Sequence, residues 1–228
     1  MMSILDIDHA LFLLLNGSGS IVLDKFALTE TSHFAWVLYV FSIIYLIVKN
    51  NKFKHTLLIL SLLVVLYLLT DTLVASFIQP TIGRLRPTTD LTFCHQVDVV
   101  NQLTGGIHGF FSNQVAKVLG FSVFLSMIFK SWSFFGFSMF WSLLHAWVLI
   151  YLGYYFPSDI LVGFLWGGAV AALLYLFYMK IGPKIVDFHV IRSDQFTLSG
   201  YYHADILFLN VTFLLNLIAI LIWSFINF

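Results

Sequence analysis

The sequence predicts an all-α fold: a polytopic membrane helix bundle with about six transmembrane helices, preceded by a short interfacial amphipathic helix. Two observations predict it. First, 60% of the residues are hydrophobic and only 10% are charged, whereas soluble domains carry about 25% charged residues. Second, several apolar runs are long enough to cross a bilayer. Backbone groups inside a bilayer need internal partners, so such runs form helices.

The first thirty residues are predicted to form an interfacial N-terminal segment (residues 1–30). Its start, SILDIDHALFLLLNG, is too short to cross a bilayer. Apolar residues recur there at helical spacing, which predicts a helix lying in the membrane interface: Ile4, Ile7, Leu11 and Leu14 or Leu15. Gly17 and Gly19 are expected to end this helix. Acidic residues stand where a signal peptide has basic ones, so no cleavable signal is expected.

Six apolar runs follow, and each is predicted to be a transmembrane helix: residues 33–48, 57–77, 115–129, 134–151, 160–178 and 206–226. Without repeats or low-complexity linkers, residues 1–228 are predicted to form a single membrane domain. Residues 180–204 are its predicted cytoplasmic loop, and residues 205–228 hold its last transmembrane helix. Small residues in the fifth run, notably Gly163 and Gly167, allow close helix approach, either within the bundle or at a dimer seam.

Basic residues predict the orientation, because cytoplasmic loops are enriched in Lys and Arg. Three loops carry them: Lys49, Lys52 and Lys54, then Lys130, then Lys180, Lys184 and Arg192. These loops are expected to face the cytoplasm. Residues 79–113 and 152–158, together with both termini, then face outward. Arg84, Arg86 and Lys117 are exceptions near the outer face.

Arg84 and Arg86 lie in the outward segment QPTIGRLRPTTD. The planar guanidinium of Arg donates two parallel hydrogen bonds and suits phosphate. The pair is therefore interpreted either as a phosphate site or as a contact with lipid headgroups.

Three segments, GRLRP, GFFSNQVA and IYLGYYFPSD, occur in this order and on one predicted face. In this they resemble the type 2 phosphatidic acid phosphatase superfamily, the lipid phosphate phosphatases related to vanadium haloperoxidases. The resemblance covers residues 57–174, which would form the phosphatase-like core. It implies a six-helix bundle with its active site at the outer membrane surface.

The family's first motif has a lysine seven residues before an Arg-Pro pair. Here Arg86 and Pro87 match, but Gln79 replaces the lysine. The second motif, Pro-Ser-Gly-His, reads Phe111, Ser112, Asn113 and Gln114. The third has Ser-Arg, a histidine six residues after the arginine and an aspartate four residues later. It reads Val148, Leu149, Tyr155 and Asp159.

The resemblance implies a mechanism in which one histidine attacks phosphorus, the other protonates the leaving oxygen, and cations hold the phosphoryl oxygens. Gln114 has no titratable proton, and a tyrosine such as Tyr155 has an unperturbed pKa near 10. Gln79 and Leu149 bring no charge. Losing such a catalytic unit can cost on the order of 10⁶ in rate. No residue is therefore predicted to be catalytic by the family mechanism, and the chain is interpreted as a degenerate member.

Other residues could in principle take over: Tyr155 itself, His108 in the Gly-rich loop, or His145 in the fourth run. A lone histidine is more often structural. The spacing of His95, Asp98 and His108 does not indicate a metal site, and neither metal nor cofactor is expected.

Two acids have a structural and a functional interpretation. Asp159 suits the start of a helix after Pro157 and Ser158, or it is what remains of a catalytic site. Asp71 lies inside the second run, where an acid is costly. It is either a proton or ion site, or a structural carboxylate paired with a helix terminus, His145 or tyrosines.

The leading hypothesis is a membrane pseudophosphatase in the bacterial inner membrane, with its degenerate site on the extracytoplasmic face. It would bind membrane lipids through Arg84, Arg86 and Ser112, or serve as an accessory subunit of a membrane-protein complex. Zero net charge gives no indication of nucleic-acid binding. The alternative is an active lipid phosphate or pyrophosphate phosphatase with an altered catalytic set. A transporter or flippase is disfavoured because no inverted repeat is found.

Overall fold

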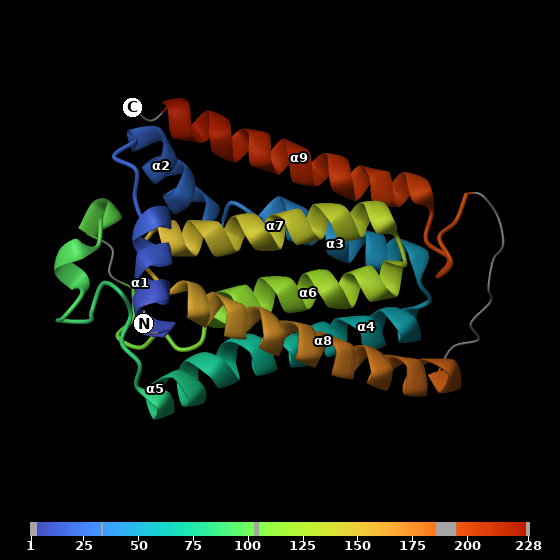
Figure 1. Cartoon of the computed structure of the whole chain (residues 1–228). Coiled ribbons are helices and arrows are strands. Elements are labelled where there is room, and N and C mark those ends of the chain that lie inside the picture. Colours follow the sequence, from blue (N-terminus) through green and yellow to red (C-terminus); the bar gives the residue numbers. More distant parts are fainter. Residues whose placement is uncertain (1–3, 33, 103–104, 186–194, 227–228) are drawn as a thin grey trace.

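The computed structural model describes residues 4–32, 34–102, 105–185 and 195–226. Its long helices run along one axis as an elongated bundle (Figure 1). In chain order the α-helices are α1 (Ile4–Leu15), α2 (Ile21–Glu30), α3 (Val37–Asn50), α4 (Phe53–Tyr67), α5 (Gln79–Ile82), α6 (Asn113–Phe129), α7 (Trp132–Tyr151), α8 (Pro157–Ile185) and α9 (His203–Ile226). Two short 3₁₀ helices, Cys94–Gln96 and Val100–Gln102, lie in the loop before α6.

The predicted all-α membrane bundle is confirmed. Within the described part of the chain, four helices are long and apolar enough to cross a membrane: Phe53–Ile82, Trp132–Tyr151, Pro157–Lys184 and His203–Ile226. The helices α3 and α6 are apolar but shorter. Each of the six predicted runs therefore corresponds to a helix. The helix of the first run, α3, begins at Val37; the predicted start, His33, lies outside the described residues.

The second span is longer than its apolar run. From α4 the chain continues through π-helical turns, Leu68–Thr72 and Val74–Ile78, into α5, as one helix of 30 residues. The sequence placed Gln79 in a loop, which is wrong, because the helix continues through Pro80 to Ile82, directly after the π-helical turn Val74–Ile78. Gly83 ends the helix in the left-handed region, at φ 71°. The side chain of Gln79 is therefore carried by a helix and is buried.

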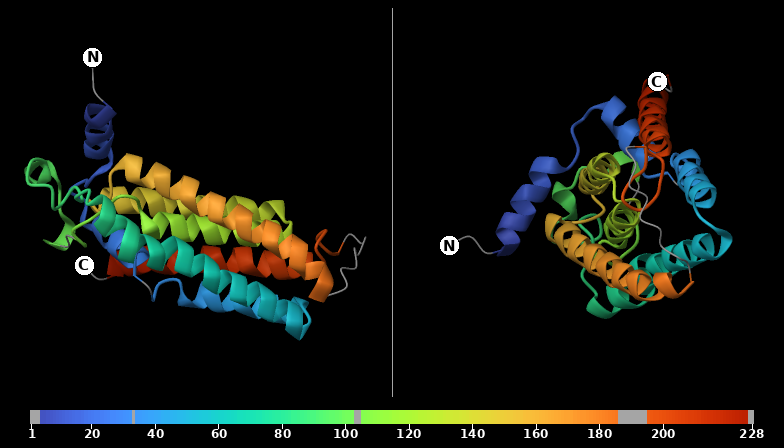
Figure 2. Two further views of the ribbon diagram at one scale, coloured as in Figure 1. Left: turned by 90° about the horizontal axis from the view of Figure 1, so that it is seen from below. Right: turned by 90° about the vertical axis from the view of Figure 1, so that its right-hand side faces the viewer.

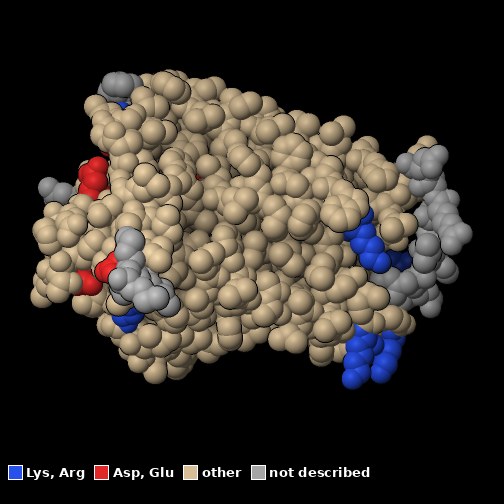
Figure 3. All heavy atoms as spheres, in the orientation of Figure 1, with Lys and Arg blue, Asp and Glu red and all other residues tan. Residues whose placement is uncertain are grey.

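The loops gather at two opposite ends. The loop before α6, the α7–α8 turn and α1 lie at one end, and the α3–α4 and α6–α7 turns lie at the other (Figure 1). Basic side chains gather at the second end on the face seen in Figure 3, whereas the acidic ones lie at the first. Arg192 and the centre of the predicted 180–204 loop fall outside the described residues, and α8 extends the fifth run to Ile185.

The small residues of α8 form a packing face within the bundle. A Cβ added at Gly163 would lie 2.7 Å from the Ser112 carbonyl oxygen, and one at Gly167 would collide with the backbone of Ala116. These glycines therefore let α8 pack directly on the first turns of α6. Next to this close approach, the Ser112 N–H donates to the Asp159 carbonyl at 3.1 Å, which joins the segment GFFSNQVA to the segment IYLGYYFPSD.

The N-terminal segment contains two helices, not the single helix predicted. The helix α1 stands across the end of the bundle (Figure 2). It buries Asp8 and Phe12, while Leu11 and Leu14 are exposed. After the glycine turn, the Ser20 hydroxyl accepts a hydrogen bond from the Leu23 N–H and starts α2. This second helix packs against α7 and α9.

Candidate functional site

The three motif segments meet at the end of the bundle in one hydrogen-bond network. The Tyr155 hydroxyl donates to Asn113 Oδ1 at 2.7 Å and accepts from Arg86 Nη2 at 3.0 Å. Gln79 Nε2 donates to the Phe111 carbonyl at 2.9 Å and to Asn113 Oδ1 at 3.3 Å. Residues far apart in the sequence, from α5, the following loop, α6 and the α7–α8 turn, therefore share one site.

Most of the network is buried, and only Asn113 is partly exposed. Tyr155 is fully buried, and Gln79 and Arg86 are 5% and 7% exposed. The Arg86 guanidinium lies 4.5 Å from the centre of the Tyr155 ring, and its Nε donates to the His108 carbonyl at 3.0 Å. A Cβ at Gly105 would lie 2.6 Å from Arg86 Nη1. The Gly-rich loop thus covers this arginine closely.

Burial also controls the chemistry of Tyr155. Desolvation raises the pKa of its phenol, and the opposing effect of the nearby Arg86 charge is smaller. The phenol is therefore protonated at neutral pH, where a nucleophilic phenolate would be needed.

Asp159 has a double role at the start of α8. Its Oδ2 accepts a hydrogen bond at 3.1 Å from the N–H of Phe156, which precedes the helix. A carboxylate at the third helical position that reaches back in this way is one half of a capping box, so the predicted helix-start role is confirmed. The other oxygen, Oδ1, pairs with Arg84 Nη1 at 2.6 Å.

Arg84 is held by two carboxylates from distant segments. Besides Asp159, it donates to Ser158 Oγ at 2.8 Å and to Asp8 Oδ2 at 2.8 Å. Asp8 in turn accepts from the Ser158 N–H at 2.8 Å and from its hydroxyl at 2.6 Å. Sequence reasoning missed Asp8. The available signal was an acid in the middle of a short, mostly apolar helix.

Two motif positions, Ser112 and Leu149, have a role in helix capping and packing. Ser112 is fully buried, and its hydroxyl caps α6 by accepting from the Val115 N–H at 3.3 Å. Its contact with a headgroup stays a prediction. Leu149 is fully buried in an apolar cluster that includes Tyr155 and Phe156, which explains why a side chain without a donor fits there.

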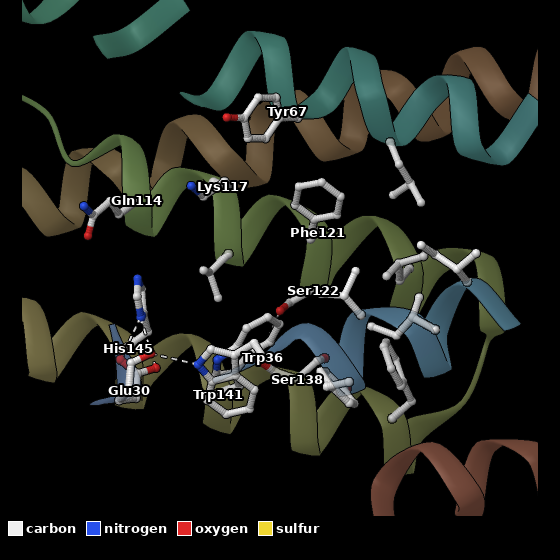
Figure 4. Close-up of a pocket in the computed structure, with 18 of the residues that line it drawn as sticks. Glu30, Trp36, Tyr67, Gln114, Lys117, Phe121, Ser122, Ser138, Trp141 and His145 are labelled. Atoms are coloured by element: carbon white, nitrogen blue, oxygen red, sulfur yellow. Dashed lines mark hydrogen bonds and ion pairs between the residues drawn. The ribbon is translucent and has the colours of Figure 1, made fainter. Parts of the chain in front are cut away.

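Gln114 follows Asn113 on α6 but forms no hydrogen bond with this network among the described residues. It lines a cavity inside the bundle together with Lys117 and His145, which come from α6 and α7 (Figure 4). His145 Nδ1 lies 3.0 Å from Oε2 of the fully buried Glu30, at the end of α2. Sequence reasoning missed Glu30, because α2 was not expected.

Asp71 is a structural carboxylate with partners on α6. It accepts from Asn113 Nδ2 at 2.8 Å and pairs with Lys117 Nζ at 3.0 Å. Of the predicted partners, His145 pairs with Glu30 instead, whereas a tyrosine, Tyr67, and the first residue of α6, Asn113, both form hydrogen bonds with Asp71. The ion pair with Asp71 also accounts for the presence of Lys117, a basic residue near the outer face.

His108 contributes its carbonyl to Arg86, while its Nδ1 is buried without a hydrogen-bond partner among the described residues. Among all the residues that the structure describes, no group of three or more His, Cys, Asp or Glu side chains could hold a metal ion.

Comparison with known proteins gives a consistent set of similarities. A family model described as the PAP2 superfamily matches residues 60–183. A protein named lipid A 4'-phosphatase from Bacteroides thetaiotaomicron is 30% identical over 181 residues, which cover 79% of this chain and 80% of the relative. A protein of the same name from Porphyromonas gingivalis is 29% identical over 178 residues, which cover 77% and 75%. No solved structure gives a significant match.

Proposed function

The chain belongs to the PAP2 superfamily, and from this premise we propose that it is a membrane pseudophosphatase. It keeps the lipid phosphatase fold, binds lipid and does not hydrolyse phosphate esters. The observation that carries this proposal is the largely buried hydrogen-bond network of Gln79, Asn113, Tyr155 and Arg86. At three of these four positions the family pattern is replaced by neutral groups that satisfy one another.

The charges around the network also argue against phosphoryl transfer. The carboxylates of Asp8 and Asp159 both pair with Arg84, so the charges of these two acids and of Arg84 and Arg86 sum to zero. Phosphoryl transfer depends mainly on positioning and on stabilising negative charge. An arginine pair without net positive charge, with Arg86 already engaged by Tyr155 and His108, supplies little of that stabilisation.

The lipid-binding part of the proposal rests on the fold, the named relatives and Arg84. The Arg84 side chain is 24% exposed, so it is the arginine of the site that a lipid headgroup can reach, in competition with Asp8 and Asp159. Arg86 and Ser112 are buried. The relatives are named for lipid A, so a lipid phosphate of that class is the first ligand to test.

The protein would act in the bacterial inner membrane, with this site on the extracytoplasmic face. The accumulation of basic side chains at the opposite end of the bundle supports that orientation. A role as an accessory subunit of a membrane-protein complex is part of the proposal. It predicts a companion protein in constant ratio after mild detergent extraction.

The test is an assay of inorganic phosphate release. The unmodified protein, in detergent and in lipid nanodiscs, is offered a panel of lipid phosphates and pyrophosphates that includes lipid A. We expect no vanadate-sensitive release above that of a Tyr155→Phe/Asp159→Ala control. Sustained release by the unmodified chain, abolished in that control, would overturn the proposal.

The second candidate is an active phosphatase with an altered catalytic set, and the Glu30–His145 pair favours it. A carboxylate that orients an imidazole is a common arrangement for a general base. This candidate predicts that His145→Ala, or His108→Ala near Arg86, abolishes a measurable activity. Neither arginine of the motif loop is among the residues that line the cavity with His145, which argues for the first candidate.

A further inference from the structure

A cavity of about 650 Å³ lies inside the bundle, bounded by α3, α4, α6 and α7 (Figure 4). Most of its wall is hydrocarbon and aromatic, including Ile43, Leu63, Val118, Phe121 and Leu125. Its volume falls within the roughly 300–1,000 Å³ of typical ligand pockets. Val40 of α3 and Val64 of α4 line it and are 45% and 58% exposed. The cavity is therefore accessible from the side on which these two helices meet the bilayer.

The polar end of the cavity has no surplus of positive charge. Lys117 is paired with Asp71, and His145 is paired with Glu30. A phosphate would gain little there. The groups left for a ligand, the Gln114 amide and the second imidazole nitrogen of His145, suit an uncharged hydrogen-bonding group.

Two further polar atoms, on residues that line the cavity, indicate what kind of group binds there. Tyr39 Oη and Trp141 Nε1 are buried and have no hydrogen-bond partner among the described residues. Tyr39 is 1% exposed, both residues line the cavity, and their rings contact each other with centroids 5.6 Å apart. Buried donors without acceptors are costly and rare in folded proteins. An ester carbonyl is uncharged and can accept two hydrogen bonds.

We propose that this cavity binds one ester-linked acyl chain of a membrane lipid, whose carbonyl oxygen accepts hydrogen bonds from Tyr39 and Trp141. The hydrocarbon occupies the apolar part of the cavity and enters between α3 and α4. The inference rests on the lipid-binding part of the proposed function and is independent of the loss of hydrolysis.

The probe is a phosphatidylethanolamine with a diazirine in one ester-linked acyl chain, incorporated into nanodiscs with the full-length protein. After photolysis, mass spectrometry locates the adducts. We expect adducts on cavity residues of α3 and α6, in addition to those on the lipid-facing perimeter. Val118→Trp fills the cavity and should reduce the cavity adducts at least fivefold. Leu165→Trp, at a position of α8 that is 74% exposed, is the matched control and should leave them unchanged.

Competition isolates the carbonyl and does not depend on the Val118 variant folding. Unlabelled ester-linked lipid should displace the cavity probe several-fold better than its ether-linked analogue, which has no carbonyl. The double variant Tyr39→Phe/Trp141→Phe keeps an aromatic ring at each position, removes both hydrogen-bond donors, and should remove that preference. Equal competition by both lipids in the unmodified protein, or labelling confined to the perimeter, would overturn the inference.

Phosphate release is measured on the same samples to separate the two proposals. Perimeter-only labelling in a protein that releases no phosphate contradicts the cavity inference alone. Phosphate release together with cavity labelling contradicts the pseudophosphatase proposal and supports the cavity inference.

Discussion

Asp8 of the first helix and Arg84 of the motif loop form an ion pair with 2.8 Å between Oδ2 and Nη2, across 76 positions of sequence. The same arginine reaches Asp159, so it joins α1 to the start of α8. Asp8 is 6% exposed, and its oxygens are also occupied by Ser158. The N-terminal helix is therefore attached to the candidate site by charge as well as by the packing of Phe12.

Removing the charge of Asp8 tests this attachment. Asp8→Asn leaves Arg84 with one carboxylate and weakens three contacts, and we expect the free energy of unfolding to fall by about 1–3 kcal/mol. Thermal unfolding in detergent gives the size of the effect, and limited proteolysis shows whether α1 detaches. Asp98→Asn, which removes a carboxylate at an exposed position of the loop at the same end of the bundle, is the control and should change little. Equal stability of both variants would contradict the role given to Asp8.

The hydroxyl of Tyr155 connects Arg86 to Asn113. Tyr155→Phe keeps the ring but leaves buried polar groups on both neighbours without this partner, which should cost about 1–3 kcal/mol of stability. Chemical denaturation of the purified protein measures that cost. Tyr154→Phe is the matched control, because its ring centroid is also near the Arg86 guanidinium, at 5.9 Å, while its side chain is less buried. A Tyr155→Phe variant as stable as the unmodified protein would contradict this network.

The raised pKa of Tyr155 predicts a pH dependence at the alkaline end. The folded state keeps a phenolic proton that the unfolded state loses above about pH 10. The stabilisation that depends on this proton is therefore complete below about pH 10 and decreases as the pH rises towards the folded pKa.

Unfolding of the unmodified protein and of Tyr155→Phe, compared from pH 7 to 11, should differ by a constant amount up to about pH 10 and by less above it. Ultraviolet absorbance gives an independent measurement of phenolate. A phenolate signal near neutral pH that disappears in Tyr155→Phe would support the nucleophilic role rejected here.

Restoring the family's residues separates the scaffold from the chemistry. We expect Gln79→Lys, Gln114→His and Tyr155→His together to give phosphate release above that of the unmodified chain, because the positions of the motifs are held by the same helices. Adding Leu149→Arg places a charge in a fully buried apolar cluster and should destabilise the protein by roughly 2 kcal/mol or more.

Phosphate release and melting temperature are measured for the threefold and fourfold variants, and a substitution at an exposed loop position, Leu91→Arg, controls for a new arginine. A threefold variant that folds but remains silent would contradict the expectation that these three positions suffice.

By itself the sequence determined the class of the fold, the existence of the six apolar helices, their two distinct ends, and the cap at Asp159. These features depend on hydropathy over one helix length or on residues a few positions apart, and a bilayer leaves backbone groups no other partner than their own helix. The resemblance also identified the motif positions, and the structure brings Gln79, Arg86, Asn113 and Tyr155 into contact.

Only the tertiary structure decided which charged groups are partners. Asp8 pairs with Arg84, and Glu30 pairs with His145 across 115 positions, so neither pair has a local signature. The acceptors of the Gln79 side chain are likewise distant in sequence: the carbonyl of Phe111 and Oδ1 of Asn113. A buried charge requires a partner wherever packing brings one near, and packing among helices is not encoded in the neighbours of any single residue.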